Sequence, residues 1–116
     1  MTETNNHHRL DYVEFGTSDL AASKAFFSEV FGWKFTDYGP DYTAFKDGRL
    51  DGGFTSAAQP STGGPLVVLF SSALETTLAA AQKAGAIIVK PTFSFPGGRR
   101  FHFVEPGGNE LAVWGE

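Results

Sequence analysis

Carboxylate, imidazole and phenol groups are the candidate reactive side chains of this chain, because its 116 residues include no cysteine. Glu14 stands two residues after Tyr12, and His102 lies in a second apolar segment far along the chain. Burial among apolar groups favours the protonated form of a carboxylate and brings it into the range useful for proton transfer. Glu14 is therefore a candidate general base, with Tyr12 or His102 assisting. The alternative is a structural carboxylate that pairs with a cation or accepts a hydrogen bond from a neighbouring tyrosine.

Several other kinds of chemistry are excluded by the residues present. Without cysteine there is no disulfide scaffold, thiolate nucleophile or cysteine-held metal centre. The adjacent glycines at 63–64, 97–98 and 107–108 do not lead from a strand into a helix as a phosphate-binding loop would. We interpret them as turns. No Gly-x-Ser-x-Gly motif is present either, so the remaining possibilities are small-molecule binding and acid–base chemistry.

The elements that must position these groups follow one pattern twice. Residues 10–16 alternate as in a strand, and helical spacing then runs from Leu20 to Gly32, with Ser18 and Asp19 as candidate N-caps. The same order recurs after residues 59–64, with a strand at 66–70 and a helix that follows an apparent capping box at 72–75. Three short strands are predicted after each helix, at 33–38, 42–46, 49–54, 86–90, 99–104 and 109–114.

This pattern predicts an α+β fold of two tandem βαβββ modules that form a cupped mixed β-sheet. Tyr12 and Leu20 recur as Leu66 and Leu74, which marks a weak internal repeat. We expect residues 1–9 to be a flexible leader and residues 10–116 to form a single domain. Its expected parts are module one (10–58), a linker (59–64) and module two (65–116).

Each sheet should cover one face with its helix and leave the other face to line a cavity. Strand alternation places Tyr12 and Glu14 on the open face, and Tyr12 and Trp114 offer flat rings for stacking. Glu110 begins its strand and is expected at a solvent-exposed rim. The predicted ligand-binding residues are Tyr12, Glu14, Phe54, Leu66, Val68, Phe70, Glu110, Ala112 and Trp114.

Charge and hydropathy narrow the range of partners. A net charge of −4 without a basic stripe argues against nucleic acid. No apolar run reaches the roughly 20 residues that span a bilayer, so we expect no membrane association and a cytoplasmic location. Open sheet edges and concave apolar faces favour a homodimer that binds a small molecule.

Three segments resemble the signature segments of the vicinal oxygen chelate superfamily, which includes glyoxalase I, bleomycin-resistance proteins and extradiol dioxygenases. They are residues 11–20 (DYVEFGTSDL), 25–33 (AFFSEVFGW) and 105–114 (EPGGNELAVW). The resemblance covers nearly the whole chain and implies the paired βαβββ fold. It does not imply one reaction, because this fold hosts lyases, isomerases, oxygenases and drug-binding proteins.

The resemblance also implies a divalent metal on the concave faces, and the ligand positions test whether this chain could hold it. They fall on Tyr12, Leu66 and Ala112, with Asp51 the nearest carboxylate to the remaining position. Such an ion needs about three or more converging protein donors, so we expect no cofactor and no metal. The alternative is a displaced site formed by Glu14, His102 and Glu110.

Three hypotheses of function follow. The first is a metal-independent binding protein of the bleomycin-resistance type for an aromatic or amphipathic small molecule. The second is an enzyme of isomerase or lyase type in which Glu14 transfers a proton. The third is a metal-dependent glyoxalase or dioxygenase that uses the displaced site.

Overall fold

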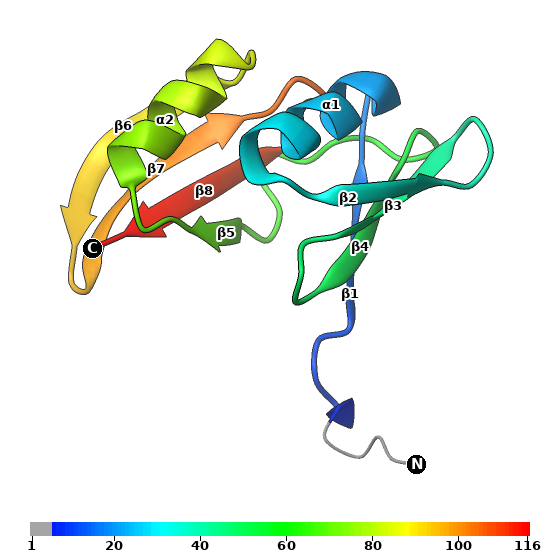
Figure 1. Cartoon of the computed structure of the whole chain (residues 1–116), viewed down its shortest axis with the longest axis horizontal. Coiled ribbons are helices and arrows are strands. Elements are labelled where there is room, and N and C mark those ends of the chain that lie inside the picture. The colour runs from blue at the N-terminus through cyan, green and yellow to red at the C-terminus, as the bar shows by residue number, and fades with distance from the viewer. Residues whose placement is uncertain (1–5) are drawn as a thin grey trace.

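Two four-stranded sheets and two helices make up the computed structural model, which describes residues 6–116 (Figure 1). The first half contains β1 (Tyr12–Gly16), α1 (Leu20–Phe31), β2 (Lys34–Asp37), β3 (Tyr42–Lys46) and β4 (Asp51–Thr55). The second half contains β5 (Val67–Phe70), α2 (Leu74–Lys83), β6 (Ile87–Phe95), β7 (Gly98–Val104) and β8 (Glu110–Gly115). The predicted repeat of the order βαβββ is confirmed.

The two sheets share one topology. Sheet A has the strand order β1-β4-β3-β2, and sheet B has the order β5-β8-β7-β6. In each sheet the first strand lies parallel to the last strand of its module, and the other pairs are antiparallel. β1 and β5 are therefore equivalent edge strands, and each helix carries the chain from one edge of its sheet to the other.

The two helices begin differently. Asp19 caps α1, because its carboxylate accepts a hydrogen bond from the backbone N–H of Ala22, and Gly32 ends the helix with a left-handed φ of 72°. The predicted capping box of α2 is wrong. Ala73 is the N-cap and makes no side-chain capping bond. The carboxylate of Glu75, which the capping box would need, pairs instead with the guanidinium of Arg99.

The strand expected at 86–90 is longer than predicted. β6 continues through Pro91 to Phe95, and its pairing with β7 shifts register after Ile88 and again after Lys90. Proline removes a backbone N–H, which is tolerated on an edge strand and at bulges, and β6 is both an edge strand and irregular at this point.

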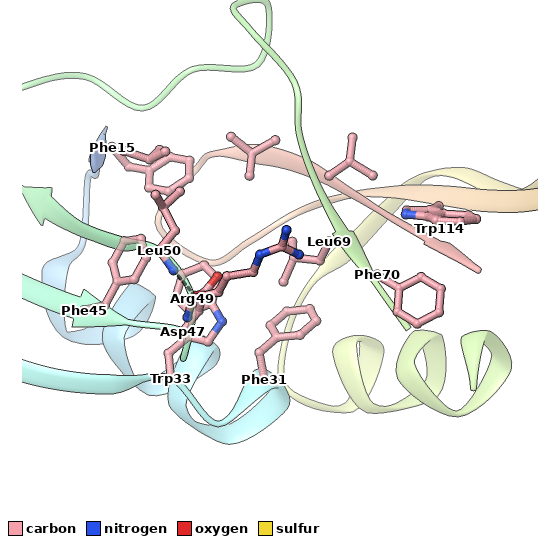
Figure 2. Close-up of a pocket in the computed structure, with 13 residues that line it drawn as sticks. Phe15, Phe31, Trp33, Phe45, Asp47, Arg49, Leu50, Leu69, Phe70 and Trp114 are labelled. Atoms are coloured by element: carbon pink, nitrogen blue, oxygen red, sulfur yellow. Dashed lines mark hydrogen bonds between the residues drawn. The ribbon is translucent and has the colours of Figure 1, made fainter. Parts of the chain in front are cut away.

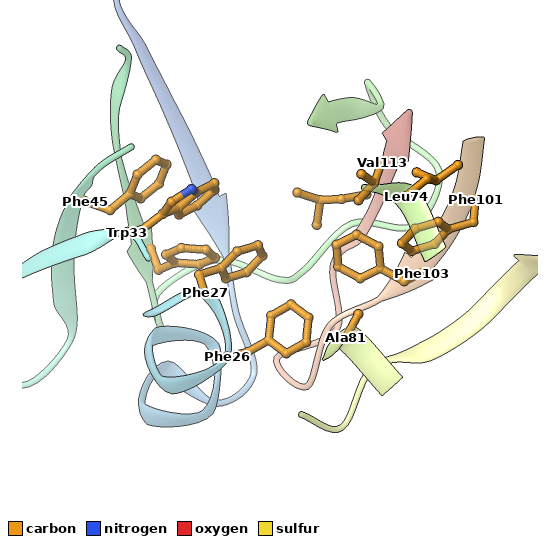
Figure 3. Packing of buried hydrophobic residues seen from close by; sticks show 11 residues of the cluster. Phe26, Phe27, Trp33, Phe45, Leu74, Ala81, Phe101, Phe103 and Val113 are labelled. Atoms are coloured by element: carbon orange, nitrogen blue, oxygen red, sulfur yellow. The ribbon is translucent and has the colours of Figure 1, made fainter. Parts of the chain in front are cut away.

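One aromatic core joins the two modules. Phe27 of α1 packs on Phe54 of β4 with ring centroids 5.3 Å apart, and Phe26 packs on Phe103 of β7 at 5.7 Å. Figure 3 shows Phe26 between the rings of module one and those of module two. Helix α1 therefore contacts the helix-facing side of sheet A and also reaches sheet B. It follows that the concave face of sheet A lies on the side of that sheet away from sheet B.

A buried carboxylate forms a second connection between the modules. Glu105 is 1% exposed and accepts hydrogen bonds from the Ser23 hydroxyl at 2.9 and 3.1 Å, the Gly107 N–H at 2.7 Å and the Asn109 side-chain amide at 2.8 Å. The same amide nitrogen donates to the carbonyl oxygen of Gly16 at 2.7 Å. This latch, formed by Ser23, Glu105, Gly107 and Asn109, holds the β7–β8 turn against β1 and α1.

Candidate functional site

The concave face of sheet A carries a chain of hydrogen bonds between Tyr12, Tyr42 and Glu14. The Tyr42 hydroxyl donates to Glu14 Oε1 at 2.9 Å, and the two tyrosine oxygens are 2.5 Å apart. Tyr42 has one proton and gives it to Glu14, so the proton between the two phenols comes from Tyr12. The hydroxyl of Tyr12 keeps its lone pairs free to accept a hydrogen bond from a ligand.

Small residues make room for the hydrogen-bonded side chains of Tyr12, Tyr42 and Glu14. Gly53 lies between Glu14 on β1 and Ala44 on β3 in the strand register. A Cβ atom at Gly53 would lie 2.1 Å from the Tyr42 hydroxyl oxygen and 2.8 Å from that of Tyr12. The two phenols can therefore lie across the middle of the sheet only because this position has no side chain. Sequence reasoning missed Tyr42, although alternation along residues 42–46 would have placed it on the same face as Ala44.

These hydrogen bonds also change the acidity of Tyr42. Burial and the hydrogen bond to Glu14 together raise the pKa of Tyr42 well above its usual value of 10.0. Its neutral phenol is favoured in the folded protein because ionisation would remove the proton that Glu14 accepts and would place a second negative charge beside it.

An alkaline titration tests this effect. The neutral phenol of Tyr42 contributes stability that is fully present below about pH 10, which is the pKa of tyrosine in the unfolded chain. This stability is lost as the pH rises further. We expect the absorbance of the folded protein at the phenolate wavelength to show a component well above pH 10 that is absent from Tyr42→Phe. Tyr38→Phe is the matched control, since Tyr38 is 65% exposed, and it should keep that component. A Tyr42→Phe curve that still contains it would contradict the assignment.

The rest of this face is polar. It forms a hollow of about 330 Å³ that Tyr12 and Tyr42 share with Lys34, Thr36 and Asp51, among others. Asp51, the nearest carboxylate to a family ligand position, is bound in a salt bridge to Lys46 with its oxygen 2.9 Å from Nζ. Glu14 itself is exposed in the single chain. The tyrosine hydrogen bond that was the structural alternative for Glu14 is present, whereas the expected apolar surroundings are not.

The concave face of sheet B holds a second polar pair. His102 is 4% exposed, and its Nδ1 lies 3.1 Å from Glu110 Oε2. Its Nε2 is buried without a hydrogen-bond partner among residues 6–116. His102 pairs with Ala112 across β7 and β8, which settles that it faces the concave side. The expectation that Glu110 is a solvated rim residue is wrong, because its side chain is only 20% exposed and bonds to His102.

The predicted ligand-binding residues are divided among separate hollows. Leu66, His102 and Glu110 border a hollow of about 200 Å³ beside residues 61–65. Val68, Phe70 and Trp114 line a larger groove along β5. Tyr12 belongs to the hollow on sheet A. One chain therefore does not gather these residues as the sequence predicted.

Two predicted ligand-binding residues are buried. Phe54 is fully buried because it pairs with Phe15 in the register of β1 and β4, and both rings face α1; its placement in the cup is wrong. Ala112 does lie on the concave side, between Val68 and His102 in the strand register, but it is 0% exposed. The sequence pattern could not place Phe54, because its strand is interrupted by Gly52 and Gly53.

The donor set at the family's metal positions does not fit a divalent ion. Of Tyr12, Leu66 and Ala112, only Tyr12 has a side-chain oxygen, and that hydroxyl is hydrogen-bonded to Tyr42. No cluster of three or more histidine, aspartate or glutamate side chains able to hold a metal occurs in the part of the chain that the structure describes. Glu14 lies on sheet A, while His102 and Glu110 lie on sheet B, so the displaced alternative also has no three converging donors within one chain.

Comparison of the sequence with protein families decides what kind of protein this is. The sequence model of the Glyoxalase/Bleomycin resistance protein/Dioxygenase superfamily matches residues 9–113. The chain belongs to this superfamily. No curated protein matches it. Within residues 6–116, neither helix of this superfamily member has the length and apolar character needed to cross a bilayer.

Solved structures share the superfamily fold at low sequence identity. A glyoxalase/bleomycin resistance protein/dioxygenase family enzyme from Burkholderia phytofirmans PsJN superposes with a TM-score of 0.79 at 19% identity, covering 91% of this chain and 98% of that one. A glyoxalase-related enzyme from Fulvimarina pelagi gives 0.77 at 19% identity, covering 94% and 88%. The fosfomycin resistance protein FosX from Listeria monocytogenes, solved with Mn(II) and 1S,2S-dihydroxypropylphosphonic acid, gives 0.74 at 16% identity, covering 94% and 91%. At these identities the likeness establishes the fold alone.

Proposed function

We propose that this superfamily member binds a small aromatic or amphipathic molecule on its concave faces without the family metal. The observation that carries the proposal is the replacement of the metal ligands by Tyr12, Leu66 and Ala112, with the Tyr12 hydroxyl engaged by Tyr42. The chain of hydrogen bonds that ends on Glu14 supplies the polar groups that orient a ligand. Leu66, Val68 and Phe70, which are 37%, 42% and 57% exposed, supply apolar area.

The complete site, in this proposal, is built by two copies of the chain. The concave face of sheet A lies on the side of that sheet away from sheet B of the same chain, as the contacts of α1 with both sheets require. A second copy can bring its own sheet B against that face. Each homodimer then has two equivalent cups, each lined by module one of one chain and module two of its partner.

A metal-free enzyme is the second candidate. It is favoured by the hydrogen bonds from Tyr12 through Tyr42 to Glu14, because such a chain can move a proton between a bound molecule and a carboxylate. In this version Glu14 accepts a proton from an acidic position of the substrate and returns it to a neighbouring atom of the same molecule, which is an isomerisation.

The binding proposal is tested with a compound found by thermal-shift screening of aromatic and amphipathic molecules. We expect Glu14→Gln to weaken its binding roughly tenfold, since a charged hydrogen-bond acceptor is lost. Glu29→Gln, on the exposed side of α1, is the matched control and should bind normally. Full affinity in Glu14→Gln would contradict the proposed site, and turnover that disappears while affinity remains would favour the enzyme.

Stoichiometric Zn, Ni, Mn or Fe whose removal by EDTA abolishes binding would overturn the metal-free site.

Mixing two defective variants tests the shared cup. Glu14→Gln impairs module one and Leu66→Asp impairs module two, so a mixed dimer has one cup with both changes and one cup with neither. Random mixing should restore binding to roughly a quarter of all sites. If binding stays lost in the mixture while mixed dimers form, the cup is not shared between chains.

A further inference from the structure

A third cavity is larger than the hollows on the two concave faces, and it includes Val68, Phe70 and Trp114 from the concave side of sheet B. It is a groove of about 500 Å³ between sheet A and β5, which we call the β5 groove (Figure 2). Strand β1 contributes Val13 and Phe15 to its lining, and these residues alternate with Tyr12 and Glu14 of the concave face. All four residues of β5 line it, so the groove follows the free edge of that strand.

The floor of the β5 groove is aromatic and rigid. Trp33 and Phe45 are 7% and 4% exposed, and their rings stack with centroids 4.3 Å apart. Trp33 also stacks on Phe27 at 4.6 Å, which fixes it from behind. Only the small exposed part of each of these rings can touch a molecule in the groove, and the other aromatic contacts come from lining residues such as Phe31 and Phe70. The volume lies within the range of about 300–1,000 Å³ typical of small-molecule sites.

One cationic side chain reaches into this apolar space. Arg49 lies in the turn between β3 and β4, and Figure 2 shows its side chain extending from the turn toward Leu69 of β5. The carboxylate of Asp47, which also lines the groove, makes no salt bridge with this guanidinium; its Oδ1 accepts the backbone N–H groups of Arg49 at 2.8 Å and Leu50 at 2.7 Å. The guanidinium makes no salt bridge or hydrogen bond within residues 6–116.

An unpaired guanidinium beside aromatic walls is suited to an anion that also has a flat apolar part. Arginine holds carboxylates, phosphates and sulfonates through paired hydrogen bonds, which are stronger when water is excluded. We propose that the β5 groove is a second ligand site for a planar aromatic anion, with its ring among the aromatic side chains that line the groove and its acidic group on Arg49. This site shares Val68 and Phe70 with the site of the proposed function but neither Tyr12 nor Glu14, so Arg49→Gln and Glu14→Gln distinguish the failure of one proposal from the failure of the other.

The probe for this site is 1-anilinonaphthalene-8-sulfonate, a planar aromatic anion whose fluorescence rises on binding. We expect binding in the groove to quench tryptophan fluorescence, because Trp33 and Trp114 line it. Arg49→Gln should weaken binding of the sulfonate roughly tenfold, the usual effect of losing a charge-assisted hydrogen bond. The uncharged N-phenyl-1-naphthylamine should bind the wild-type protein and Arg49→Gln equally.

Matched variants separate the β5 groove from other surfaces. Arg9→Gln, in the exposed segment before β1, and Glu14→Gln, on the concave face, should each leave the affinity for the sulfonate within twofold of wild type. Unchanged affinity in Arg49→Gln, or weakened affinity in Glu14→Gln, would overturn the proposal. A third result would also overturn it: the wild-type protein does not bind the sulfonate, and Leu69→Glu converts a wild-type dimer into monomers. The groove would then be covered by a second copy of the chain.

Discussion

Glu105→Gln is expected to lower the free energy of unfolding by about 2–3 kcal/mol. The two carboxylate oxygens of Glu105 accept hydrogen bonds from Ser23, Gly107 and Asn109, and the residue is 1% exposed. An amide in its place turns one acceptor into a donor that faces another donor. Each buried polar group left without a partner costs about 1–3 kcal/mol, and water cannot reach this site to replace the bond. Chemical denaturation of the variant and wild type measures the difference directly.

The midpoint of thermal unfolding should fall by roughly 10 °C in the same variant, as expected for a domain of this size. Glu29→Gln on α1 makes the same chemical change at an exposed position and should shift the midpoint by little. A Glu105→Gln protein as stable as this control would mean that the latch does not hold the modules together.

Phe26→Ala is expected to cost about 3–5 kcal/mol, the usual loss when a buried aromatic ring is removed. The Phe26 ring is 2% exposed and lies 5.1 Å from that of Phe27 and 5.7 Å from that of Phe103, so its removal leaves a cavity between the modules. Much of a typical stability of about 5–15 kcal/mol would be lost. Urea denaturation at neutral pH gives the size of the effect.

Phe70→Ala is the matched control for this prediction. Phe70 is 57% exposed and packs against Trp114, with ring centroids 5.0 Å apart. Its removal should cost less than half as much as the removal of Phe26. Equal losses in the two variants would contradict the assignment of Phe26 to a core that both modules share.

Most of the secondary structure could be predicted from local patterns. Alternation found β1, and Asp19 and Gly32 marked the ends of α1, because strand period, side-chain capping and a left-handed glycine are properties of a few neighbouring residues. The errors arose where a distant partner decides. Glu75 pairs with Arg99 rather than capping α2, and β6 passes through Pro91 because that strand is an edge.

The candidate site was predictable in its residue types but not in its arrangement. Tyr12 and Glu14 were found because they alternate on one strand. Tyr42 was missed because its contact with them depends on the register of three strands and on the missing side chain at Gly53. Phe54 was misplaced for a related reason, since only its pairing with Phe15 shows which face it takes.

By itself, then, the sequence determined that two βαβββ modules repeat and that cysteine chemistry is excluded, and its resemblance to the superfamily implied metal-ligand positions that fall on Leu66 and Ala112. Only the tertiary structure decided that the predicted cup is divided, because α1 packs against both sheets and the concave face of sheet A is left on the side away from sheet B. It also placed Arg49 beside Trp33 and β5. Residue types limit the chemistry that is available, whereas long-range packing decides which side chains can act on one molecule.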